Sequence, residues 1–293
     1  MVRTVFSVLI ALAISFVIIF LVSDQPLEAI KYLLIGPFTN KRSMGNVVES
    51  MIPLIFTGTG VCIMFSANQI NLAGEGAFHI GGLIASCVAI KLTATFVSPF
   101  MALLCAGLVG ALFTAIPAIM KITTTASEMV SSLMINYLAL YFGNYMLNNV
   151  IGDPKASAAS YKLADAAELP VLIPGTRVHL GFIIAIAVAV LGYFFLYRTK
   201  TGYELRLAGE NEEFAKYSGI SIVKVIMISQ LLGGFVAGLG GGVEMLSPIY
   251  SRFTWTSLLG YGWDAIIICT LSVWYCGSVY VRRGFKMANF GLQ

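Results

Sequence analysis

The stretch VFSVLIALAISFVIIFLV, residues 5–22, is 18 residues long and carries no charged side chain. It follows Arg3 and is longer than the roughly 7–15 apolar residues of a signal peptide, and no small-residue cleavage site comes after it. A helix needs about 20 mostly apolar residues to cross a bilayer. The stretch therefore predicts a first transmembrane helix that stays attached to the chain.

The rest of the chain has the same character. Of its 293 residues, 58% are hydrophobic and 11% are charged, whereas a soluble domain carries about 25% charged residues. These charges are too few to cover the surface of a water-soluble protein of this length. The composition excludes a soluble enzyme and indicates an integral membrane protein whose solvent is membrane lipid.

Seven more apolar runs follow the first. They lie at residues 47–65, 74–91, 96–120, 127–147, 178–197, 220–243 and 261–281. We expect an all-α polytopic membrane protein with about eight transmembrane helices in one domain, residues 1–293. Two polar segments separate the runs: residues 148–177, with three prolines, and residues 198–219, with eight charges.

Orientation follows from the basic residues of short loops, which collect in the cytoplasm. An N-terminus on the inside places Arg3, Lys121, the basic residues of segment 198–219 and those of residues 282–286 there. We therefore expect a cytoplasmic N-terminus, a cytoplasmic segment 198–219 and an external loop at residues 148–177.

Residues 68–76, NQINLAGEG, place amides, a carboxylate and two glycines between two apolar runs. Backbone that leaves the helical geometry inside a membrane survives only where protein or a water-filled cavity satisfies it. We expect a helix break near residues 68–76. Two interpretations stay open: Asn71 and Glu75 face a translocation path, or the stretch is a polar turn that joins two spans.

Glu128 lies at the start of the fifth apolar run. Its spacing from Thr125 is that of a capping box, so its plain role is to start a helix. Ser132 and Asn136 follow at four and eight residues and give this helix a polar stripe. The stripe fits either hydrogen bonding between helices or the lining of a pore.

The seventh run contains Gly234, Gly238 and Gly242, two overlapping GxxxG frames that favour close helix packing. Asp264 stands directly before the last run, beside Trp263. A carboxylate in this place is either functional or an anchor at the membrane interface.

The sequence lacks the residue patterns of metal sites, redox-active cysteines and ATP-binding loops. His79 and His179 lie far apart, the five cysteines form no CxxC pair, and no P-loop motif occurs. The net charge of +4 is scattered and gives no nucleic-acid surface. We expect no enzyme, no metal, no cofactor and no nucleic-acid partner.

Segment 198–219 gives a more specific indication of function than the other polar segments. Residues 210–217 suit a short amphipathic helix that Gly219 can end. Phe214 and Tyr217 lie one helical step apart and suit insertion into a groove of a partner; the alternative is a solvated loop.

Residues 201–220, TGYELRLAGENEEFAKYSGI, resemble the cytoplasmic coupling loop of ABC-importer permeases of the branched-chain amino acid, ribose and nucleoside class. Three more segments resemble the same class: NLAGEG at 71–76, TASEMVSSLMINY at 125–137 and GYGWD at 260–264. They are most similar to nucleoside and simple-sugar permeases. The resemblance covers about residues 45–270. After about Leu271 the chain departs from the class, which continues there through further spans.

The resemblance implies a permease subunit of an ATP-driven ABC importer in the cell membrane, which translocates nucleosides or simple sugars. Separate cytoplasmic ATPase subunits would hydrolyse ATP and dock on segment 198–219. A second permease subunit, identical or paralogous, and an extracytoplasmic substrate-binding protein over residues 148–177 complete the expected assembly. The positions expected to couple to the ATPase are Gly202, Arg206, Gly209, Glu210, Asn211, Ala215, Gly219 and Ile220.

Polar groups near the spans are expected to supply hydrogen bonds beside the translocation path. They are Asn71, Glu75, Glu128, Asn136, Tyr137 and Asp264. The rival hypothesis is an ion-coupled secondary transporter in which Glu75, Glu128 and Asp264 relay protons. A membrane-embedded enzyme is a third class, which the lack of a nucleophile–base pair disfavours.

Overall fold

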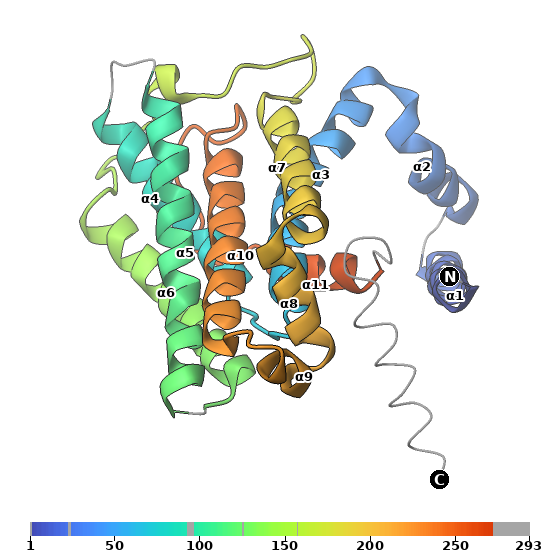
Figure 1. Cartoon of the computed structure of the whole chain (residues 1–293). Helices are drawn as coiled ribbons and strands as arrows, with labels where there is room; N and C mark the ends of the chain where they lie inside the picture. The colour runs from blue at the N-terminus through green and yellow to red at the C-terminus, as the bar shows by residue number, and fades with distance from the viewer. Residues whose placement is uncertain (1, 23–24, 93–96, 125, 157, 272–293) are drawn as a thin grey trace.

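The computed structural model describes residues 2–22, 25–92, 97–124, 126–156 and 158–271 (Figure 1). Every regular element in these ranges is a helix, so the all-α prediction is confirmed there. The α-helices are α1 (Val2–Val22), α2 (Pro26–Thr39), α3 (Lys41–Ser66), α4 (Gly74–Lys91), α5 (Ser98–Thr124), α6 (Glu128–Asn149), α7 (Gly181–Arg198), α8 (Lys200–Glu210), α9 (Glu212–Tyr217), α10 (Ile222–Met245) and α11 (Tyr261–Leu271). A 3-10 turn, η1 (Asp165–Ala167), lies between α6 and α7.

Four of these helices, α3, α5, α7 and α10, are long and apolar enough to cross a membrane by length and composition. A shorter apolar stretch, Leu9–Val22, belongs to α1. The predicted runs at 74–91 and 127–147 correspond to α4 and α6, which are helical but not among those four. The predicted number of about eight spans is thus not confirmed. The run at 261–281 is helical over Tyr261–Leu271, and its remainder, like the basic residues at 282–286, lies outside the described residues.

Helix α10 lies at the centre of the fold and packs against α3, α4 and α5. Glycines permit this close approach. A Cβ on Gly238 would lie 2.5 Å from the carbonyl oxygen of Ala106 in α5, and one on Gly234 would lie 2.6 Å from that of Gly110. The GxxxG prediction of a packing surface is confirmed, since the backbones of α5 and α10 meet where no side chain fits.

Figure 1 shows α8, α9 and the beginning of α10 at the lower end of the bundle. The loop that precedes α7 lies at the opposite, upper end. This loop belongs to segment 148–177, which docks on the chain after α10: Leu163 N–H donates to Ser251 O at 2.9 Å, and Leu169 N–H donates to Leu246 O at 2.9 Å. The two polar segments of the sequence therefore lie at opposite ends of the bundle.

Segment 198–219 differs from its prediction. It holds two helices, not one, because Thr199 and Asn211 each begin a helix. The Thr199 hydroxyl accepts a hydrogen bond from Gly202 N–H at 3.0 Å, and the Asn211 side chain accepts one from Phe214 N–H at 3.1 Å. Such caps satisfy backbone donors that a helix start leaves without partners. Gly219, with φ +81°, follows α9 as predicted.

Candidate functional site

The predicted helix break is present. Helix α3 ends at Ser66 and α4 begins at Gly74, and residues 67–73 between them form no helix. The fully buried side chain of Asn71 holds this stretch together. Its carbonyl oxygen accepts a hydrogen bond from Ala73 N–H at 2.7 Å, and its amide donates to the Gln230 side chain of α10 at 2.6 Å. The break is therefore tied to the central helix.

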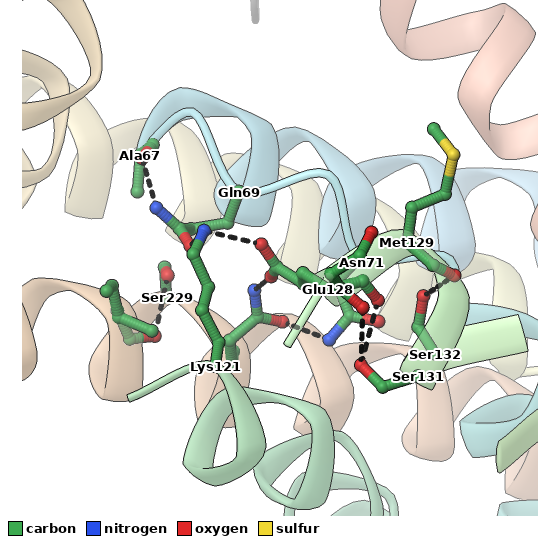
Figure 2. Close-up of polar contacts among 12 residues, drawn as sticks. Ala67, Gln69, Asn71, Lys121, Glu128, Met129, Ser131, Ser132 and Ser229 are labelled. Atoms are coloured by element: carbon green, nitrogen blue, oxygen red, sulfur yellow. Dashed lines mark hydrogen bonds and ion pairs between the residues drawn. The ribbon is translucent and has the colours of Figure 1, made fainter. Parts of the chain in front are cut away.

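An ion pair between a partly exposed lysine and a buried glutamate lies beside the break (Figure 2). Lys121 at the end of α5 lies 2.8 Å from Glu128 at the start of α6, and it also donates to Gln69 Oε1 at 2.5 Å. Gln230 donates to the other oxygen of Glu128 at 2.5 Å. We call this group the break cluster; its members are Gln69, Asn71, Lys121, Glu128 and Gln230. The cluster joins the break to α5, α6 and α10, and it satisfies a carboxylate that would be costly to bury alone.

The polar stripe of α6 faces the break. Ser132 Oγ accepts a hydrogen bond from Leu72 N–H at 3.1 Å. Asn136 donates to Leu72 O at 2.9 Å and accepts from Gly76 N–H at 2.9 Å. These contacts supply the partners that a broken helix lacks inside a membrane. Hydrogen bonding between helices, one of the two interpretations of the stripe, is confirmed.

The predicted role of Glu128 in starting a helix is confirmed, but the capping box with Thr125 is not. Helix α6 begins at Glu128 itself, with Ser127 as the residue before it, and no side chain caps its first turn. Thr125 lies outside the described residues. The Glu128 carboxylate instead turns toward Lys121 and Gln230.

Glu75, in the first turn of α4, has a different partner. Its carboxylate accepts hydrogen bonds from Gly260 N–H at 2.7 Å and from Gly262 N–H, at the start of α11. The residue is 2% exposed. A carboxylate at this place satisfies backbone donors and complements the positive end of the helix dipole. Glu75 therefore fixes α11 against α4.

Two other predicted path residues lie apart from these contacts. Tyr137 is 53% exposed on the outer face of α6, and Asp264 is exposed in the first turn of α11. The structure thus brings Asn71, Glu128 and Asn136 together around the break and leaves Tyr137 and Asp264 on the surface of this chain. A role for the six residues in a path stays a prediction.

The predicted coupling residues of α8 dock this helix on its neighbours. Arg206 Nε donates to Leu196 O, near the end of α7, at 3.0 Å, and its guanidinium lies 4.7 Å from the ring centre of Tyr197. A Cβ on Gly202 would overlap the backbone of α7, and one on Gly209 would overlap the carbonyl oxygen of Ser66. Helix α8 is therefore held against α7 and against the last residue of α3.

Helix α9 presents aromatic side chains outward. Asn211 caps it and Ala215 is fully buried beneath it, while Ile220 behind it packs on the core. Glu210 ends α8 just before this cap. Phe214 is 54% exposed and Tyr217 is 89% exposed. The exposed aromatic pair has the position that docking into a partner's groove requires.

Sequence reasoning missed four polar residues: Gln69, Lys121 and Gln230 of the break cluster, and Glu244. Glu244 lies near the end of α10, 2% exposed, and its Oε2 atom has no hydrogen-bond partner among the described residues. The available signal was a single amide or charged group inside, or shortly after, an apolar run. Such a group is rare in a membrane helix and marks a contact or a function.

Comparison with known proteins identifies the relatives of this chain. The family model described as "Branched-chain amino acid transport system / permease component" matches residues 43–282. The guanosine ABC transporter permease protein NupP of Bacillus subtilis is 30% identical over 240 residues, which cover 80% of this chain and 69% of the relative. No solved structure matches the chain significantly.

Two further relatives carry similar names. The glucose ABC transporter permease protein TsgB13 of Haloferax volcanii is 31% identical over 280 residues, 91% of this chain and 73% of the relative. The nucleoside ABC transporter permease protein NupB of Lactococcus lactis is 26% identical over 260 residues, 84% of this chain and 71% of the relative.

Proposed function

Since the chain belongs to the family of branched-chain amino acid transport system permease components, we propose that it translocates nucleosides or simple sugars as the membrane subunit of an ATP-driven importer. The names of its relatives support both substrate classes. The observation that carries the proposal is the packing of Gly209 on Ser66, which connects α8 to the start of the helix break.

In the mechanism we infer, movement of the ATPase subunits is transmitted through packed helices to the helix break. Cytoplasmic ATPase subunits dock on α9, where Phe214 and Tyr217 are exposed. Movement of α8 then displaces the end of α3 through Gly209 and Ser66, one residue before the break begins. The hydrogen bonds of Asn71 and Gln69 carry this displacement to α10 and α5, and the Lys121–Glu128 ion pair carries it on to α6. Packed elements with discrete arrangements transmit motion in this way.

The rest of the assembly follows from this arrangement. A cytoplasmic N-terminus is inferred from the basic residues of the short loops alone. With α9 in the cytoplasm, segment 148–177 at the opposite end of the bundle faces the substrate-binding protein. A second permease subunit covers exposed polar groups such as Asp264 and Tyr137, because a carboxylate in a span faces protein or water and not lipid. Asn71, Glu75, Glu128 and Asn136 then lie behind the path and hold its helices in place.

The ion-coupled alternative is less favourable. Proton relays need carboxylates that exchange protons with water and move between partners. Glu128 is fixed by Lys121 and Gln230, and Glu75 by two backbone N–H groups. Both carboxylates stabilise the packing of helices, and their hydrogen-bond partners occupy the oxygens that a proton relay would need.

The docking of α9 is tested by co-purification. Phe214→Asp combined with Tyr217→Asp places two charges on its exposed face, and we expect the ATPase subunits to be lost from the purified complex. Tyr161→Asp is the matched control, since Tyr161 is an exposed aromatic residue in segment 148–177, at the other end. Retention of the ATPase by the α9 variant would refute this docking site. Arg206 is unsuitable for this test, because its side chain holds α8 on α7.

A further inference from the structure

A groove lies between the start of α3 and the turn that precedes α7, two helices that pack side by side (Figure 1). Its volume is about 460 Å³, within the range of small-molecule sites. Its walls include Met44 and Val48 of α3, Leu172 and Ile173 of the turn, and Phe182 of α7. Met44 is 49% exposed and Ile173 is 50% exposed. The groove is therefore apolar and open at the surface of two helices that are able to cross a membrane.

The walls of this groove are held by the protein itself. Leu172 N–H donates to Val178 O at 2.8 Å, and Thr176 N–H donates to Ile173 O at 3.1 Å, which closes the turn before α7. The turn packs directly on α3, since a Cβ on Gly45 would lie 2.6 Å from the Cβ of Thr176. The shape of the groove is thus formed before any ligand binds.

One end of the groove is positively charged. Lys41 lines this end, and Arg42 follows it in the first turn of α3, which contains no acid. Both residues are exposed, and neither forms an ion pair among the described residues. No acid lines the groove; Glu49, half-buried beyond it on α3, is countered by Arg177. The charge of Lys41 and Arg42 is therefore available to an anionic ligand.

A second groove shows what is particular about the first. It lies between α5 and α6, has a volume of about 490 Å³, and has no charged residue in its lining. Lipid tails of any kind can cover such a surface. The groove at α3 combines an apolar wall with basic side chains at a helix end, where lysine and arginine reach the headgroups of the membrane. This combination fits a ligand with an apolar chain and an anionic head.

We propose that the groove between α3 and the turn before α7 binds one anionic phospholipid. Its phosphate lies on Lys41 and Arg42, and one acyl chain fills the groove against Met44, Ile173 and Phe182. Basic pockets between membrane helices select anionic headgroups in this way. The bound lipid joins α3 to the end of segment 148–177, whichever molecule the chain translocates.

Native mass spectrometry of the purified protein in detergent measures the affinity of the first bound lipid. The probes are phosphatidylglycerol and phosphatidylcholine with the same acyl chains. We expect phosphatidylglycerol to bind about tenfold more tightly or better, because two basic residues attract its charge. Lys41→Gln combined with Arg42→Gln should remove this preference and leave the affinity for phosphatidylcholine unchanged, which shows that the groove is intact.

Lys91→Gln combined with Lys155→Gln is the matched control for charge. Lys91 ends α4 and Lys155 belongs to segment 148–177; both are exposed and neither lines the groove. This pair should keep the full preference for phosphatidylglycerol. Equal affinities of the two lipids for the unaltered protein, or the same loss in both double variants, would show surrounding membrane lipid only and overturn the proposal. Loss of both lipids alike in the Lys41 and Arg42 variant would also overturn the headgroup assignment.

The apolar part of the site has its own test. Ile173→Asn places an amide in the groove and should weaken phosphatidylglycerol binding, whereas Met134→Asn, at a similarly exposed position in the groove between α5 and α6, should not. Soluble glycerol 3-phosphate, a headgroup without acyl chains, should not displace the lipid. Displacement by glycerol 3-phosphate, or unchanged binding by Ile173→Asn, would show a simple phosphate site and refute the binding of an acyl chain in the groove.

Discussion

Gly209 of α8 lies directly against the carbonyl oxygen of Ser66, the last residue of α3. No side chain fits between them, so the two helices meet backbone to backbone. Ser66 itself is buried, and its hydroxyl donates to Cys62 O at 2.7 Å. Through this contact, α8 packs on the residue that directly precedes the helix break, and α9 follows α8 in the chain.

We expect Gly209→Ala to separate α8 from α3, because a Cβ at residue 209 would overlap the Ser66 oxygen. Overpacking of this kind costs about 1–3 kcal/mol. The ATPase subunits would still bind α9, so the variant is expected to hydrolyse ATP with much reduced substrate uptake. The measurement is the ratio of transport rate to hydrolysis rate in reconstituted vesicles.

Gly36→Ala is the matched control for this variant. Gly36 also lies within a helix, α2, and a Cβ there would meet no atom within 4 Å. We expect its transport ratio to equal that of the unaltered chain. An unchanged ratio in Gly209→Ala as well would contradict coupling through Ser66.

Removing one member of the ion pair in the break cluster should cost more than removing both. Lys121→Met leaves Glu128 buried without its cation, and we expect a loss of about 2 kcal/mol in the free energy of unfolding, since Lys121 is partly exposed. Lys121→Met with Glu128→Gln should recover part of this loss, because Gln230 keeps a neutral partner. Thermal unfolding of the purified variants measures the difference, and equal stability of the two would argue against a stabilising ion pair at Glu128.

Asn136→Ala should destabilise the break itself. The change leaves Leu72 O and Gly76 N–H without their partner in a buried place, at about 1–3 kcal/mol for such groups. Asn149→Ala is the control in the same helix, since Asn149 is exposed and bonds only its own helix at Tyr145 O. We expect proteolysis or hydrogen exchange to rise at residues 67–73 in the first variant. Equal protection in both would show that Asn136 does not hold the break.

The end of the bundle at segment 148–177 should depend on pH through Asp153. A hydrogen bond from Arg252 at 2.7 Å and one from Lys155 N–H at 2.9 Å hold the pKa of Asp153 below its ordinary value of 3.8. Because the folded pKa is lowered, the stabilisation is present above about pH 4 and is lost as the pH falls through the folded pKa. Near neutral pH, Asp153→Asn should therefore have a lower melting temperature than the unaltered chain. This difference in melting temperature should disappear below about pH 3. A difference in melting temperature that stays constant with pH would exclude this ion pair as its cause.

The helices could be predicted from the sequence where local signals are strong. The run at residues 74–91 agrees with the bounds of α4, because the polar break precedes it and Lys91 ends it. The close approach at Gly234 and Gly238 was readable from their spacing alone. Both signals lie within one segment of chain.

The contacts of the candidate site were not predictable in the same way. Gln230 and Asn71 are 159 residues apart in the sequence, and Glu128 and Gln230 are 102 apart. A single amide in an apolar run shows that a partner exists but not which one. Helix α8 was missed because it is short and charged, and its fixed position comes from Arg206 and Gly209, whose partners belong to α7 and α3. Glu244 was missed because the predicted run ended at residue 243, which placed the acid outside the helix.

Uptake into vesicles that contain the chain, its ATPase subunits and its binding protein tests the central claim most directly. Labelled guanosine or glucose is offered on the side of segment 148–177, with ATP on the side of α9. We expect accumulation that requires hydrolysable ATP and continues when an uncoupler removes the proton gradient. Accumulation that is indifferent to ATP and abolished by the uncoupler would contradict it.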